Sequence, residues 1–365
     1  MRIFNGKVFG ADHKMHDKDL CFENGIITAS SESGEFDASG CYVLPGLIDT
    51  HIHGARGLSF MSADLDLSPA LDWLCSQGVT SIMVTTACQS PEALKKVCES
   101  IKNINDSRIL GIHAEGPFVN PVRKGGMTAE AIQTPNENLP EMMYEASGGL
   151  LKIMTLAPEI EGAEEAIKKC VDLGILVSIG HSDATYEQAK KAVEAGASRL
   201  THTFNAIRPY NHREPGALGY ALDDEKVHCE LICDLYHVSA PAVRLVLKLK
   251  GHENVTMISD SLFFCGMGDG EYVRGGKTMY VKDGLCTLQD GTINGSTRCL
   301  FDGAKNMFEL GCTPEQIAVM ASVNPAKAAG STDRGELIEG YKADILIVDS
   351  EFNIKAVFTE GKRVR

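Results

Sequence analysis

Eight short apolar runs, separated by stretches with helical spacing, limit the fold of this sequence more than any other feature. The runs lie at Tyr42–Ile48, Val79–Val84, Ile109–Ile112, Leu151–Leu156, Ile175–Ile179, Leu200–Phe204, Val227–Ile232 and Val255–Ile258. Segments between them, such as PEALKKVCESIKN and TYEQAKKAVEAG, place apolar residues three and four apart, as amphipathic helices do. Strands that alternate with helices form parallel sheets through right-handed crossovers. We therefore predict an α/β protein built on a closed (β/α)8 barrel, a TIM-like barrel.

An open, doubly wound sheet is the competing architecture for the same alternation of strands and helices. In that fold a glycine-rich GxGxxG turn often follows the first strand. The sequence has no such motif after its first apolar run. The barrel is therefore the favoured interpretation.

Both ends of the chain have the pattern of short β-strands. RIFNGKVF, DLCFENGIIT, ADILIVDS and NIKAVFTEGKRVR alternate apolar and polar residues and are interrupted or flanked by turn-forming residues, a pattern typical of hairpins. No helical segment lies among them. We predict a small β-sandwich domain made of residues 1–48 and 333–365, and a barrel with the catalytic site over residues 49–332.

The segment that follows the eighth apolar run combines a glycine-rich part with two helical parts. Residues 266–295 are rich in Gly and hairpin-like, which predicts an excursion over the mouth of the barrel. Helical spacing near 296–310 and 314–329 predicts two helices that complete the barrel wall.

Charge and composition exclude several classes of protein. Asp and Glu outnumber Lys and Arg by 49 to 35, and the net charge of −14 argues against nucleic acid or anionic lipid as a partner. The sequence has no run of eighteen apolar residues and no secretory signal pattern, so we expect no membrane span and no export. Its twelve cysteines form no CxxC pair, which favours reduced thiols in a cytoplasmic protein.

Ionisable residues follow the predicted strands at the end where barrel enzymes carry their active sites. They are His51 and His53 after the first strand, Glu115 after the third, His181 and His202 after the fifth and sixth, and Asp260 after the eighth. Taken singly, each has an ordinary structural explanation, such as a turn histidine or a capping acid. Together they place four imidazoles and two carboxylates at one end of the barrel, where burial without partners costs several kcal/mol each.

This set of side chains predicts a site for a divalent metal, with a purely hydrogen-bonded network as the competing interpretation. Imidazole and carboxylate ligands suit zinc, iron or manganese, and we expect zinc. Six ligands are too many for one tetrahedral ion with an open position, so two ions bridged by Glu115 fit better. The ligands would be His51, His53, Asp260 and Glu115 for one ion, and Glu115, His181 and His202 for the other.

The metal would lower the pKa of a water and make hydroxide available as nucleophile. Asp260 would then act as the catalytic acid/base, either as a metal ligand or only as a proton carrier. His237, at the end of the seventh strand, could polarise a substrate carbonyl. It could equally be a histidine on a surface loop.

Six motifs now resemble a known superfamily when they are taken in order. PGLIDTHIHG, HAEGPF, GHSDAT, THTFNAI, HREPG and ISDS resemble the amidohydrolases, and more closely their N-acetylglucosamine-6-phosphate deacetylase branch. The resemblance covers essentially the whole chain. It implies an amidohydrolase-type barrel, a phosphorylated amino-sugar substrate, release of acetate, and a homodimer that completes each site across its interface.

The resemblance also implies roles for individual residues. Glu115, His181 and His202 match the metal ligands common to the branch, whereas His51 and His53 match only its two-metal members, so one or two ions per subunit are implied. Asp260 matches the acid/base and His237 the carbonyl-polarising histidine. The implied substrate contacts are Gly126, Met127, Asn205, Ala206, Arg213, His237, Asn294, Gly295 and Ser296. Arg213 suits phosphate because a guanidinium pairs with it bidentately, although by itself it is typical of a surface ion pair.

Three departures from the branch's pattern fall at the expected sugar end of the site. Met127 stands where a His or Gln is usual, Leu235 where a Gly is usual, and Leu262–Phe264 where a small residue and a nearby Pro are usual. Changed polar contacts can alter sugar discrimination strongly. The expected substrate is therefore N-acetylglucosamine 6-phosphate or a related sugar such as its galactosamine epimer. Two further interpretations compete with this one: an amidohydrolase for an N-acyl amino acid or cyclic amide, and a barrel without catalytic function.

Overall fold

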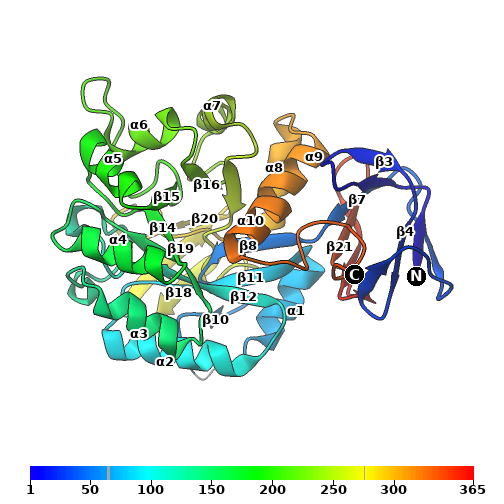
Figure 1. Cartoon of the computed structure of the whole chain (residues 1–365), viewed down its shortest axis with the longest axis horizontal. Helices are drawn as coiled ribbons and strands as arrows, with labels where there is room; N and C mark the ends of the chain where they lie inside the picture. Colours follow the sequence, from blue (N-terminus) through cyan, green and yellow to red (C-terminus); the bar gives the residue numbers. More distant parts are fainter. Residues whose placement is uncertain (64–65, 275) are drawn as a thin grey trace.

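The computed structural model describes residues 1–63, 66–274 and 276–365, and its largest part is a barrel of eight parallel strands (Figure 1). The strands are β8 (Leu47–Ile52), β11 (Val79–Thr86), β12 (Ile109–Glu115), β13 (Leu151–Leu156), β14 (Leu176–Ile179), β15 (Ala197–Leu200), β16 (His228–Ile232) and β17 (Val255–Ile258). Each pairs with the next along the chain, and β8 meets β17 where the Asp260 amide donates to the His51 carbonyl at 2.9 Å. The predicted (β/α)8 barrel is confirmed.

A helix follows each barrel strand and covers its outer face. These helices are α1 (Ser68–Ser76), α2 (Pro91–Ile104), α3 (Asn138–Ala146), α4 (Ala163–Asp172), α5 (Tyr186–Glu194), α6 (Gly216–Asp223), α7 (Ala240–Lys250) and α8 (Leu300–Glu309). Local signals set their ends: Ser90 caps α2 by accepting from the Ala93 amide, and Thr185 and Gln188 form a capping box on α5. The second predicted C-terminal helix is α9 (Pro314–Ala318), a π-helical turn (Val319–Val323) and α10 (Asn324–Ala329).

Strands from both ends of the chain form two further sheets, and both termini lie in this part of the molecule (Figure 1). One has the order β5 (Ile26–Thr28), β4 (Leu20–Glu23), β1 (Arg2–Phe4) and β6 (Glu35–Asp37). The other has the order β23 (Lys362–Arg363), β22 (Ile354–Thr359), β21 (Ile345–Val348), β7 (Tyr42–Pro45), β2 (Lys7–Phe9) and β3 (Met15–Asp17). Phe22 of the first sheet packs edge-on against Phe358 of the second, with ring centroids 5.4 Å apart.

Two sequence-based assignments in these sheets and the barrel differ from the structure. RIFNGKVF is not a hairpin, because β1 and β2 belong to different sheets, whereas DLCFENGIIT does form the β4–β5 hairpin. The run Tyr42–Ile48 is not one barrel strand: β7 ends before Gly46 and β8 begins after it. A Cβ on Gly46 would lie 2.2 Å from Thr80 Oγ1, so the chain enters the barrel where a side chain has no room. The domain division at residues 48 and 333 stays a prediction.

The glycine-rich segment after β17 forms a small antiparallel sheet. Its strands are β18 (Gly270–Arg274), β19 (Lys277–Lys282) and β20 (Leu285–Thr287), and residue 275 lies outside the described residues. A two-stranded ribbon, β9 (Gly54–Ala55) and β10 (Leu58–Ser59), follows β8. Short 3-10 turns at Pro121–Arg123 and Ala129–Ala131 lie in the loop after β12. In the described part of the chain, no helix has the length and apolar character needed to span a bilayer.

Candidate active site

A cavity of about 640 Å³ opens at the carboxyl ends of the barrel strands, and we call it the barrel-mouth cavity. Five of the predicted metal ligands and the predicted carbonyl-polarising histidine line it: His53, Glu115, His181, His202 and Asp260, with His237. His51 lies beneath them and is fully buried. The β18–β19 hairpin contributes to the wall of this cavity, so the excursion after β17 borders the site as the sequence predicted.

Glu115 is the centre of the ligand cluster, a name we use for His51, His53, Glu115, His181, His202 and Asp260. Its Oε1 lies 2.9 Å from Nε2 of both His181 and His202, and 3.4 Å from Nε2 of His51. Its Oε2 lies 3.2 Å from His53 Nε2. One carboxylate on β12 therefore contacts four imidazoles from the ends of three other strands, β8, β14 and β15.

The outer nitrogens of two histidines fix which ring nitrogen carries the proton. His181 Nδ1 lies 2.8 Å from the Arg123 carbonyl, and His51 Nδ1 lies 3.1 Å from Glu230 Oε2. Both partners only accept, so each Nδ1 donates and each Nε2 is left with a lone pair in the neutral ring. Those lone pairs face carboxylate oxygens, and His51 Nε2 has no hydrogen-bond partner among the described residues. A cation between nitrogen and oxygen removes this repulsion, either as a second proton on the ring or as a metal ion, so the donor set fits a metal.

Charge distribution in the ligand cluster supports the same conclusion. Burial would lower the pKa of His53, yet hydrogen bonds to Asp260 and Glu115 raise it to about 9. Burial would raise the pKa of the Glu115 carboxyl, but the charges of His181 and His51 hold it well below its usual range. The cluster thus stabilises positive charge at its centre. Within the ligand cluster, two sets of three side chains each bring their ligand atoms within 4.8 Å of one another. One set is His51, His53 and Asp260, and the other is Glu115, His181 and His202.

Unusual backbone geometry places three of these side chains. His181, His202 and Asp260 have φ angles of 47°, 27° and 50°, in the left-handed region that L-residues seldom adopt. Each of the three residues follows the end of a strand. Holding a residue in this backbone conformation costs about 1–3 kcal/mol of folding free energy, which contacts elsewhere in the fold must offset. His202 lies in a turn after β15, which ends at Leu200, so the sixth strand stops earlier than the predicted Leu200–Phe204. The strained turns direct these side chains into the cavity.

Glu230 is a candidate functional residue that could not be identified from the sequence. It lies on β16, is fully buried, and accepts from His51 Nδ1, while Arg199 Nη2 lies 3.6 Å from its other oxygen. Burial would raise its pKa, but the hydrogen bond to His51 and nearby positive charge hold it at about 2. The detectable signal was an acid inside the run VHCELI, in which His228 is the only other ionisable residue besides the Cys229 thiol. His113 packs against His51, with ring centroids 4.6 Å apart, and burial lowers its pKa to about 3.

Asp234 is a second residue that sequence reasoning left without a role. Its Oδ2 lies 2.7 Å from His237 Nδ1, and its Oδ1 accepts from the His237 and Tyr236 amides. The Nδ1–H of His237 therefore points to Asp234, and the residue's Nε2 is left for the cavity. Burial would lower the pKa of His237, but the bond to Asp234 raises it, so the ring holds a second proton, on Nε2, more readily than a free imidazole does.

The predicted substrate contacts divide into two groups. Gly126, Met127, Asn205, Ala206, Asn294 and Gly295 line the barrel-mouth cavity. A Cβ on Gly126 would lie 1.8 Å from Asn294 Oδ1, so glycine allows the two loops to meet. The second group, Arg213 and Ser296, is not among the described residues that line the cavity. Arg213 is exposed, and the buried Ser296 hydroxyl donates to Asp234 Oδ2 at 3.3 Å.

The three departures from the family pattern are also separated by the structure. Met127, Leu262 and Phe263 line the cavity, and Met127 Sδ lies 3.2 Å from Cys88 Sγ. Leu235 and Phe264 are not among the described lining residues. Leu235 has a φ of 64°, a conformation that glycine adopts without strain, so this replacement costs backbone energy rather than a sugar contact.

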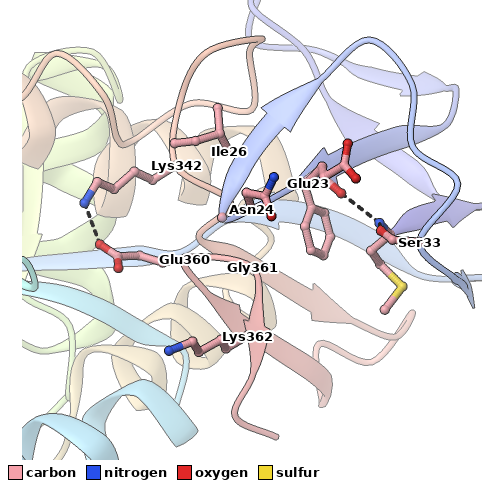
Figure 2. Close-up of a pocket in the computed structure, with 11 residues that line it drawn as sticks. Glu23, Asn24, Ile26, Ser33, Lys342, Glu360, Gly361 and Lys362 are labelled. Carbon is pink, nitrogen blue, oxygen red and sulfur yellow. Dashed lines mark hydrogen bonds and ion pairs between the residues drawn. The ribbon is translucent and has the colours of Figure 1, made fainter.

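A second cavity, of about 540 Å³, lies in the terminal sheets (Figure 2). Lys342 and Glu360 on its wall form an ion pair of 2.5 Å, which satisfies their charges internally. None of the described residues that line it is a histidine or a cysteine. The chemistry expected of this chain is therefore concentrated at the mouth of the barrel.

Comparison with known proteins places this geometry in a family context. The model of the amidohydrolase family matches residues 42–364. An N-acetylglucosamine-6-phosphate deacetylase of Lysinibacillus sphaericus is 35% identical over 99% of this chain and 96% of its own length, and an N-acetylgalactosamine-6-phosphate deacetylase of Escherichia coli O157:H7 is 31% identical over 95% of each. The solved structure of a Mycobacterium smegmatis N-acetyl-D-glucosamine-6-phosphate deacetylase variant, in complex with N-acetyl-D-glucosamine-6-phosphate, has a TM-score of 0.92 at 28% identity, covering 100% and 99% of the two chains.

Proposed function

The chain belongs to the amidohydrolase family, and we propose that it removes the acetyl group of an N-acetylhexosamine 6-phosphate, with N-acetylglucosamine 6-phosphate as the expected substrate. The products are acetate and the amino sugar phosphate. The observation that supports this proposal most strongly is the ligand cluster beside His237 in one cavity. The volume of the barrel-mouth cavity lies within the range of about 300–1,000 Å³ that is typical of small-molecule sites, so the cavity can enclose a hexosamine phosphate.

We propose that His51, His53, Asp260 and Glu115 hold one divalent ion and that Glu115, His181 and His202 hold another. Imidazole and carboxylate donors suit zinc, iron or manganese, and zinc is the expected ion. When bound, such an ion acts as a Lewis acid that lowers the pKa of water and polarises a carbonyl. Glu230 and Arg123 support this arrangement because they hold the proton of His51 and His181 on Nδ1.

Asp260 and His237 divide the proton chemistry between them. Burial would raise the pKa of Asp260, but its hydrogen bond to His53 and the charge of His51 lower it, so the carboxylate is ionised and ready to accept a proton. It takes a proton from water during attack and returns it to the amide nitrogen when the C–N bond breaks. His237, oriented by Asp234, donates from Nε2 to the acetamide oxygen as negative charge develops there.

Turnover of the two epimers tests this function. We expect kcat/KM for N-acetylglucosamine 6-phosphate to exceed that for the galactosamine epimer, because the curated relative with the higher identity acts on the former. Initial rates of acetate release, measured on both sugars with the metal-loaded protein, give the ratio. The reverse ratio would identify the galactosamine epimer as substrate. Inactivity on both, together with turnover of an N-acyl amino acid, would contradict the sugar-phosphate assignment.

We further propose that the protein is a homodimer and that Arg213 of one subunit reaches the phosphate bound by the other. Its exposed position, away from the cavity of its own chain, supports a role at a subunit contact. We expect Arg213→Ala to raise KM for the sugar phosphate about tenfold, since a charged hydrogen bond contributes about 1.5–3 kcal/mol, and to leave kcat within threefold. Arg244→Ala, another exposed arginine, is the matched control. A monomer by light scattering with unchanged KM in R213A would refute this arrangement.

We place this reaction in the cytoplasm. All twelve cysteines are free thiols, and nine of them are buried. Thiols in this number persist in a reducing compartment.

A further inference from the structure

The β18–β19 hairpin brings two positive charges together at the barrel-mouth cavity. Arg274 and Lys277 are directly opposite each other in the antiparallel register, next to the turn that joins the strands. Side chains at opposed positions of a ladder project from the same face, and like charges there are destabilising. Both residues line the cavity. We call Arg274 and Lys277 the cation pair.

Neither member of the cation pair has an acidic partner in the described part of the chain. Lys277 Nζ donates to the Gly126 carbonyl at 2.6 Å and to Thr128 Oγ1 at 3.2 Å. Arg274 donates to Ser62 Oγ at 2.7 Å, and its guanidinium lies 5.3 Å from the centre of the Phe263 ring. No carboxylate of the described residues lies within 4.0 Å of either side chain, whereas arginines elsewhere in the molecule form close ion pairs with acids.

The contacts of the cation pair hold it in place without neutralising it. Neutral oxygens of Gly126, Thr128 and Ser62 fix the two side chains, and an arginine that makes one such bond retains four further N–H donors. Burial and then the nearby charge of Lys124 lower the pKa of Lys277, while the more distant carboxylate of Glu130 acts in the opposite direction. An anion in this part of the cavity would gain a positively charged hydrogen-bond donor from each of the two residues.

The wall of the barrel-mouth cavity therefore carries two different kinds of polar group. One part of its wall carries the acidic and imidazole groups of the ligand cluster, and another part carries the cation pair. Gly126 connects them, because its carbonyl accepts from Lys277 while its loop lines the cavity beside Met127. A ligand that fits both parts carries an amide at one end and an anionic group at the other.

We propose that Arg274 and Lys277 bind the phosphate of the substrate from the same chain that supplies the ligand cluster. This assignment rests on the proposed function and specifies its phosphate contacts within one subunit. Arg contributes a planar fork that matches phosphate oxygens, and Lys contributes a point charge. The hairpin is then a specificity element that selects phosphorylated amides over neutral ones.

Single and double variants of the cation pair test the assignment. We expect Arg274→Gln and Lys277→Gln each to raise KM for N-acetylglucosamine 6-phosphate about tenfold and the double variant about a hundredfold, with kcat within threefold, because two charged hydrogen-bonding groups are lost. Lys277→Arg keeps the charge and should stay within threefold of wild type in KM. Lys282→Gln removes a charge from the outer face of the same strand and is the matched control.

Calorimetry with glucosamine 6-phosphate and with inorganic phosphate provides a readout that does not depend on turnover. We expect the double variant to bind both at least tenfold more weakly while its melting temperature stays within a few degrees of wild type. If the wild-type protein deacetylates the sugar phosphate and the double variant keeps its KM and its phosphate affinity, the cation pair is not the phosphate site, and the proposed function stands. If the wild-type protein does not turn over sugar phosphates, the proposed function fails, and unchanged affinity for inorganic phosphate in the double variant then rejects the cation pair as an anion site.

Discussion

Asp260→Asn should lower kcat about a thousandfold and leave KM nearly unchanged. Asparagine has the same shape but cannot accept a proton from water or return one to the leaving nitrogen, and general acid–base catalysis contributes about 10²–10⁴ in rate. Asn also tolerates the left-handed backbone that Asp260 adopts, at a φ of 50°, so the fold should survive. Steady-state kinetics of acetate release measure the effect.

Metal content distinguishes the two roles of Asp260. If D260N retains the metal content of wild type by elemental analysis and loses activity, the carboxylate acts chiefly as a proton carrier. Loss of one equivalent of metal along with activity would identify it also as a required ligand. A kcat within threefold of wild type would show that the proton passes through another group.

Glu115→Gln should have the second large effect, in this case on metal retention. Among the described residues, Glu115 alone contacts all four histidines of the ligand cluster. The amide of Gln presents a neutral oxygen and a donor where two anionic oxygens were. We expect the purified variant to lose most of its transition metal and at least a thousandfold in kcat/KM. Elemental analysis and competition with a chelator of known affinity measure the first effect directly.

Glu230→Gln provides a graded comparison for Glu115→Gln. Glu230 does not face the cavity but holds His51 through Nδ1, and loss of such an outer contact typically weakens metal binding about 10–100-fold. The order of metal affinity should therefore be wild type, then E230Q, then E115Q. Equal metal affinity in wild type and E115Q would mean that Glu115 is not a metal ligand, and no bound metal in the wild type would leave a hydrogen-bonded network.

The barrel and the position of its site were predictable because both depend on local patterns. Continuous apolar runs show which segments are buried on both faces, and the next polar residue along the chain then falls at the functional end of a parallel barrel. His53, Glu115 and Asp260 were found in this way, and all line the cavity. The boundary at Gly46 was missed because the apolar run continues through it, although the strands on either side belong to different sheets.

Other features of the site depend on contacts between residues far apart in the chain. Glu230 meets His51 across 179 positions, and no local pattern marks an acid on one strand as the partner of a histidine on another. The register of the β18–β19 hairpin likewise decides that Arg274 and Lys277 face each other. The resemblance implies a phosphate contact for Arg213, yet in its own chain this residue is exposed and is not among the described residues that line the cavity.

The sequence by itself therefore determined the eight-stranded barrel and the residue types at its mouth, since burial period and strand order are properties of the chain. Only the tertiary structure decided that one carboxylate, Glu115, contacts four imidazoles, and which outer partners orient those rings. It also decided which of the predicted substrate contacts line the same cavity as the ligand cluster. The physical reason is that hydrogen bonds and charge pairs act over about 3–4 Å, and the closure of the barrel, rather than spacing along the chain, sets those distances.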